Sequence, residues 1–182
     1  MTPREIEEYS ALRATIRERG TTRVWIFVVG LIAWAALAVA TAALASPPVA
    51  ALLPLLILAA AFEAVFALHI GVERVGRFLQ VFYEDEWETA AMAFGRPAGA
   101  VATDALFSVP FLIAALFNLG PVAIVNPVPV EWIFVGGAHA LFALRVIVAR
   151  YLAAKQRPID LERFRQLKNG PPLPLGEHNR EQ

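Results

Sequence analysis

Cysteine is absent from this chain of 182 residues. Disulfide bonds, thiolate metal sites and cysteine-based redox chemistry are therefore excluded. Charged residues are also scarce, at 18%, and sixteen cations balance sixteen anions. Because the formal net charge is zero, the chain lacks the overall positive field that non-specific nucleic-acid binding requires. We expect no nucleic-acid partner.

Catalytic motifs are missing as well. The sequence contains no phosphate-binding glycine loop, no HExxH pair and no G-x-S-x-G turn. We expect no histidine beside Ser10, Ser46 or Ser108, so a serine nucleophile would have no base. The sequence therefore predicts a non-enzymatic protein with no cofactor and no metal centre.

Apolar residues are abundant, at 58% of the chain, and the mean hydropathy is +0.56. A transmembrane helix needs about 20 consecutive apolar residues, and four stretches approach this length: 24–45, 48–70, 99–119 and 130–154. The first is longer than the apolar part of a signal peptide and follows an acidic segment, so we expect it to stay as a helix. The predicted fold is all-α and polytopic, with four transmembrane helices in a lipid bilayer.

Breakers and charges arrange these spans into two hairpins. Ser46-Pro47-Pro48 separates the first two spans, and prolines interrupt the segment 120–129 between the last two. All sixteen Lys and Arg residues fall in 1–23, 71–98 and 145–182. Since cations are retained on the cytoplasmic side, the sequence predicts an inner-membrane protein with both termini in the cytoplasm.

The polar segments predict further helices. Thr2-Pro3-Arg4-Glu5 matches a capping box, and residues 1–20 follow as a cytoplasmic amphipathic helix that we expect to end near Gly20. The apolar period of the second span continues into the cytoplasmic segment 71–98, as far as Phe82. The tail 155–182 is expected to contain a short helix around 160–167 and a disordered end.

Three charged residues in the predicted spans share one depth. Glu63 and Arg145 each lie 15 residues from the outer end of their span, and Asp104 lies five residues from the inner end of its own. At 1.5 Å per residue, all three lie about 22 Å below the outer boundary. The sequence thus predicts an intramembrane cluster of Glu63, Asp104 and Arg145, which either holds the helices in register or conducts protons or cations through a titrating carboxylate.

Two histidines complete the set of intramembrane polar residues. His69 and Glu73 are spaced i,i+4 on one helix face, as metal ligands often are. His139 is expected about 17 Å away from His69 in depth, too far for joint ligation. We therefore expect His69 to be an interfacial polar residue beside Glu73, and His139 to be a hydrogen-bonded packing residue.

Small residues are spaced along the first span (Gly30, Ala33, Ala36, Ala40, Ala43) and the last (Gly136, Ala140, Ala143). Such ladders favour close helix packing. Together these patterns predict a structural, assembly or accessory subunit of a membrane complex or a homo-oligomer, with a protein partner or self-association. The alternative is a small transporter or ion-conducting protein that uses Glu63 and Asp104.

Overall fold

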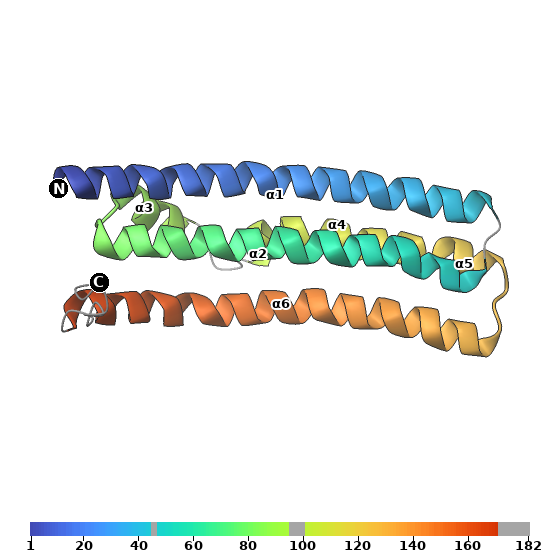
Figure 1. The fold of residues 1–182 in the computed structure, drawn as a ribbon. Helices are drawn as coiled ribbons and strands as arrows, with labels where there is room; N and C mark the ends of the chain where they lie inside the picture. Colours follow the sequence, from blue (N-terminus) through green and yellow to red (C-terminus); the bar gives the residue numbers. More distant parts are fainter. Residues whose placement is uncertain (45–46, 95–100, 171–182) are drawn as a thin grey trace, which may run out of the picture.

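The computed structural model describes residues 1–44, 47–94 and 101–170, with the side chains among them except those of 92, 94 and 101–107. The described chain is all-helical (Figure 1). The elements in order are α1 (Pro3–Ala43), η1 (Pro48–Ala51), α2 (Leu52–Phe82), α3 (Glu86–Phe94), α4 (Val101–Asn118), α5 (Gly120–Ile124) and α6 (Pro129–Asn169).

Three of the described helices are long and apolar enough to cross a membrane: α1, α2 together with η1, and α6. This composition indicates a membrane protein. With 41 residues each, α1 and α6 are about 61 Å long, twice the ~30 Å of a hydrocarbon core. The helices therefore continue well beyond any apolar section.

Helix α1 begins as the sequence predicts but does not end where we expected. The Thr2 hydroxyl accepts a hydrogen bond from the Glu5 amide at 3.3 Å, and the Glu5 carboxylate accepts one from the Thr2 amide at 2.6 Å. The expected stop near Gly20 is wrong, because α1 runs on to Ala43. A glycine costs a helix only about 1 kcal/mol, and contacts between α1 and the rest of the protein hold the helix on both sides of Gly20.

Helix α6 likewise continues where a break was expected. It passes through Pro158 and ends at Asn169, so the separate short helix predicted around 160–167 is part of α6. A proline inside a helix removes one backbone hydrogen bond and strains the preceding turn. The neighbouring side chains of Arg157 and Asp160 both bind α2, and these contacts keep the helix continuous. Residues 171–182, which include the end predicted to be disordered, lie outside the described residues.

Helix α2 is the centre of the fold. In Figure 1 it lies between α1 and α6, with α4 behind it. Its side chains Leu58 and Phe62 are buried together with Phe111 of α4 and Val146 of α6. The ring centroids of Phe62 and Phe111 are 5.6 Å apart in an edge-to-face arrangement, a favoured geometry for aromatic pairs.

Of the two glycines in the small-residue ladders, Gly30 makes a close helix contact and Gly136 does not. A Cβ atom at Gly30 would lie 2.5 Å from the Cβ of Ala61, so α1 and α2 approach closely there. In contrast, a Cβ atom at Gly136 would have no neighbour within 4 Å. The remaining alanines of the α1 ladder are exposed: Ala33, Ala36, Ala40 and Ala43. Close packing within the chain is therefore confirmed at Gly30, whereas these four alanines of α1 do not line such a contact.

A second packed region lies where α2 and α6 continue beyond the apolar section. Phe78 and Phe82 stack with centroids 4.4 Å apart, and Phe164 of α6 packs edge-to-face against Phe78 at 5.7 Å. Lys168 donates a hydrogen bond of 2.8 Å to the carbonyl oxygen of Val81. The ends of α2 and α6 are thus joined by their own aromatic core.

Candidate functional site

The most extensive polar site is a network of ion pairs between α2 and α6. Arg77 of α2 is only 4% exposed, and its Nη2 lies 3.2 Å from Oδ2 of Asp160, itself 7% exposed. Its Nη1 lies 3.5 Å from Glu73, one turn earlier on α2. Arg157 of α6 also binds Glu73 through both nitrogens of its fork, with Nε at 3.0 Å. Arg74 of α2 also lies 3.5 Å from Asp160. Three arginines and two carboxylates therefore compensate one another, with Arg77 and Asp160 buried.

His69 extends this network towards α1. Nη1 of Arg23 lies 2.8 Å from Nδ1 of His69, and Nε2 of His69 lies 3.4 Å from Glu73. Because an arginine only donates hydrogen bonds, this geometry assigns the acceptor role to Nδ1 and the proton to Nε2, facing Glu73. The predicted pair of His69 and Glu73 therefore belongs to an interhelical chain of polar groups that joins α1, α2 and α6.

Glu63 and Arg145 lie together, as their common depth suggests. Nη2 of Arg145 is 2.8 Å from Oε2 of Glu63, and the two side chains are 47% and 48% exposed. The third member of the predicted cluster, Asp104, has a side chain outside the described residues. The described part of this cluster is thus a single ion pair between α2 and α6.

His139 occupies a separate buried polar site near the other end of the helices. Its Nε2 is 3.1 Å from Nδ2 of Asn118, which also donates to the carbonyl oxygen of Ala51 at 2.8 Å. Its Nδ1 lies 2.8 Å from the carbonyl oxygen of Val135. Asn118 and His139 are 3% and 5% exposed, so this site fastens α4 and α6 to η1.

No group of three or more metal-ligating side chains occurs in the described ranges. His69 and Glu73 come nearest to a ligand pair, but Arg23 occupies the imidazole nitrogen that faces away from Glu73. A guanidinium group at that position repels a cation. The geometry is that of an ion-pair network.

No family model, curated protein or solved structure matches this chain.

The beginning of α1 docks on the turn between α2 and α3. The Tyr9 hydroxyl donates a hydrogen bond of 2.8 Å to Asp85, and Arg13 forms an ion pair of 2.6 Å with Glu88. Partial burial acts to raise the pKa of Asp85, but hydrogen bonds from Tyr9 and the Glu88 amide, with the charge of Arg13, hold that pKa below its usual value. The ionised form of Asp85 therefore stabilises the contact between the beginning of α1 and the turn that follows α2.

This docking is expected to weaken in acid. A carboxyl group whose pKa is lowered by folding contributes stability above its unfolded pKa, and that stability is lost as the pH falls through the folded value. Spin labels attached at Ser10→Cys and Glu86→Cys report the distance between α1 and α3. We expect the distribution of this distance to be unchanged from pH 7 to 5 and to broaden below about pH 4. Asp85→Asn should broaden it already at pH 7. An acid-insensitive distance in both proteins would contradict the docking role of Asp85.

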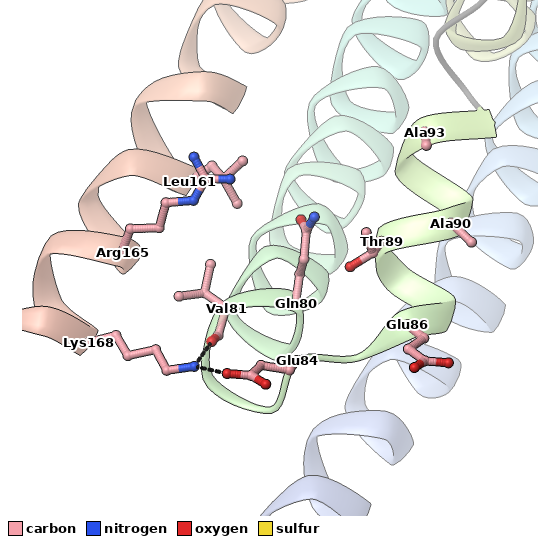
Figure 2. A pocket seen from close by; sticks show the side chains of 10 residues that line it. All are labelled: Gln80, Val81, Glu84, Glu86, Thr89, Ala90, Ala93, Leu161, Arg165 and Lys168. Carbon is pink, nitrogen blue, oxygen red and sulfur yellow. Dashed lines mark hydrogen bonds and ion pairs between the residues drawn. The ribbon is translucent and has the colours of Figure 1, made fainter.

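An open groove of about 550 Å³ lies between the ends of α2, α3 and α6. Figure 2 shows α6 on one side of it and α3 on the other, with Gln80 and Val81 of α2 between them. Lys168 lies at the end of the α6 side of the groove. It contacts Glu84 at 2.8 Å and thereby lowers the pKa of that carboxyl group. The lining residues are Gln80, Val81, Glu84, Glu86, Thr89, Ala90, Ala93, Leu161, Arg165 and Lys168.

Several residues of these sites were not predicted from the sequence. The sequence analysis names neither Arg77 nor Asp160 as a site residue, although the two form the buried pair of the network. The two are 83 positions apart, and no local spacing relates them. Asn118 carried a weak signal, since a carboxamide at the end of an apolar span needs hydrogen-bond partners.

Proposed function

We propose that this chain is a non-enzymatic structural or accessory protein of the inner membrane, with four spanning helices and a rigid cytoplasmic bundle that docks another protein. The observation that carries the proposal is the ion-paired continuation of α1, α2 and α6. Beyond the Arg23–His69 contact, 20 further residues of α1 (Pro3 to Thr22) extend the bundle, which corresponds to about 30 Å.

The four-span arrangement is supported by helix lengths and charge. Helix α4 has 18 residues, within the range of about 17–25 residues seen for helices that cross a bilayer. The connections 44–48 and 119–129 contain no Lys or Arg, as expected of extracytoplasmic turns. In Figure 1, α1 begins and α6 ends at the same end of the molecule. With four spans, both termini and the groove face the cytoplasm.

Accessibility to an impermeant thiol reagent tests this arrangement, because the natural chain has no cysteine. We expect Val125→Cys to be labelled in intact cells. Glu86→Cys, at the first residue of α3, should be labelled only after the membrane is permeabilised. The reverse pattern would invert the orientation, and labelling of both positions in intact cells would contradict the four-span topology.

A docking function is supported by how the charges of the bundle are used. The charged groups between α2 and α6 neutralise one another: Glu73, Arg77, Arg157 and Asp160. Because these groups are paired, they stabilise the bundle and are not available for chemistry. The groove at its end combines apolar walls with Lys168, Arg165 and two glutamates. Such a mixture of apolar surface and a charged rim is typical of protein contact surfaces.

Purification in mild detergent tests the docking function. We expect a discrete protein to copurify in a fixed ratio with the natural chain. Ala93→Trp, which fills the groove, should reduce that ratio about tenfold, while Ala11→Trp on the exposed side of α1 should leave it unchanged. Equal recovery with both variants would remove the groove from the docking surface, and purification of the chain alone would contradict an accessory role.

The Glu63–Arg145 pair supports a second candidate, a small transporter or ion-conducting protein. Ionisable residues inside a membrane often line ion pathways, and Glu63 lies within a spanning helix of this topology. Proteoliposomes with the natural chain would then show pH-dependent flux that Glu63→Gln abolishes. Equal ion flux in vesicles with and without the protein would eliminate this candidate.

A further inference from the structure

One face of the central helix α2 is left uncovered in its membrane section. Exposed positions of α2 recur every three to four residues, opposite the face that Leu58 and Val65 bury. In Figure 1, α1 and α6 flank α2, and α4 lies behind it. The exposed positions of α2 define what we call its open face. They are Leu53, Leu56, Ala60, Glu63 and Ala67.

This open face carries the ion pair of Glu63 and Arg145. Arg23 is the last cation of α1, and its contact with His69 at 2.8 Å fixes the level on α2 that serves as the reference for depth. Glu63 precedes His69 by six residues on α2, which places it about 9 Å deeper in the membrane. Arg145 is bound to Glu63 at 2.8 Å instead of extending to the interface, as an arginine facing lipid would.

Lipid is a poor neighbour for this pair. Nearly half of each side chain is exposed, and charged groups that contact hydrocarbon are costly even when paired. Charged residues in spanning helices almost always face protein or a water-filled cavity. The half-exposed pair therefore indicates that protein covers this face.

An apolar groove of about 420 Å³ adjoins the pair on the same side of α2. It runs between α1 and α2, and it reaches Ala60, one turn from Glu63. The close approach at Gly30 and Ala61 forms its floor. A helix of another chain that packs on the open face would find both a shallow groove for its apolar side chains and a charged pair beside it.

We propose that a second copy of this chain covers the open face of α2, in a two-fold symmetric dimer whose axis is parallel to the membrane normal. In such an interface each contact occurs twice, with residue i facing j and j facing i. Glu63 of one copy then faces Arg145 of the other, and the two intrachain pairs close into a ring of four charges.

Self-complementarity favours a second copy over another protein. The face presents one anion and one cation side by side, so a two-fold rotation brings opposite charges together. Two copies of one chain also hold these groups at the same depth, because the rotation preserves depth and keeps all termini on one side. The depth argument rests on the four-span topology proposed above. The charge complementarity follows from the ion pair alone.

Exchange of charge between two variants tests the contact. Glu63→Arg gives a face with two cations, and Arg145→Glu gives a face with two anions. In nanodiscs, measured by energy transfer between labelled copies, each variant alone should dimerise about tenfold more weakly than the natural chain. A mixture of the two should recover dimers that contain one copy of each, which an ion pair confined to one chain does not predict.

A second set of variants guards against loss of folding. Ala60→Trp leaves the ion pair intact but adds bulk to the open face, and it should weaken dimerisation, whereas Ala40→Trp on the exposed side of α1 should not. Helix content and thermal unfolding of each variant in detergent report on the fold. The proposal is overturned if the natural chain is a monomer in nanodiscs, or if the mixture forms no more dimer than its components. Neither outcome affects copurification of a cytoplasmic partner, so the docking function is judged separately.

Discussion

Replacement of Arg77 by alanine is expected to lower the free energy of unfolding by about 3–5 kcal/mol, the cost of breaking a buried ion pair from one side. Arg77 is 4% exposed, and Asp160, 3.2 Å from it, is 7% exposed. Without the guanidinium group, Asp160 keeps a buried negative charge whose remaining partners are the half-exposed Arg74, with Nε at 3.5 Å, and the amide of Gln156. The loss should be visible as a lower midpoint of denaturant unfolding in mild detergent.

Two further variants serve as controls for this loss of stability. Arg165→Ala removes an exposed arginine of α6 that lies 4.0 Å from Glu162, and exposed pairs contribute at most about 1 kcal/mol. Arg77→Met combined with Asp160→Leu removes both buried charges, and we expect it to recover most of the stability. If Arg77→Ala were as mild as Arg165→Ala, the network would not be buried between α2 and α6.

Substitution of Gly30 by alanine is expected to lower the free energy of unfolding through overpacking in the apolar section. A Cβ atom there would lie 2.5 Å from the Cβ of Ala61, so α1 must move away from α2 to accept any side chain. Overpacking of this kind costs roughly 1–3 kcal/mol. The same unfolding measurement in detergent should show the loss.

The chain offers a matched control for this prediction. Gly136 lies in α6, and a Cβ atom there would meet nothing within 4 Å, so Gly136→Ala should be neutral or stabilise by up to about 1 kcal/mol. The double variant Gly30→Ala/Ala61→Gly transfers the methyl group from one helix to the other and should restore the contact. Equal effects at Gly30 and Gly136 would show that α1 and α2 do not approach closely.

Gly30 and Gly136 illustrate that a sequence pattern does not reveal which small residue makes a close helix contact. Both belong to ladders of small residues, and the pattern treats them alike. Only Gly30 makes a close helix contact, because close packing depends on which side of a helix meets its neighbour. Similarly, the i,i+4 spacing places His69 beside Glu73, but no spacing reveals that Arg23 and Arg157 join them.

Helix ends show the same limit. Gly20 and Pro158 are local signals for a break, and both lie inside continuous helices. The local penalty is about 1 kcal/mol for glycine and about 3 kcal/mol for proline. Contacts made by Tyr9, Arg13, Arg157 and Asp160 with distant segments outweigh these penalties. A single sequence shows the penalty but not the contacts that offset it.

By itself, the sequence determined the helical class, the membrane character and the common depth of Glu63 and Arg145, because apolar length, charge distribution and helical rise are local properties of the chain. The tertiary structure alone decided which polar groups meet. It joined Arg77 to Asp160 and Asn118 to His139, and it left one face of α2 uncovered, since these outcomes depend on how helices far apart in sequence pack against one another.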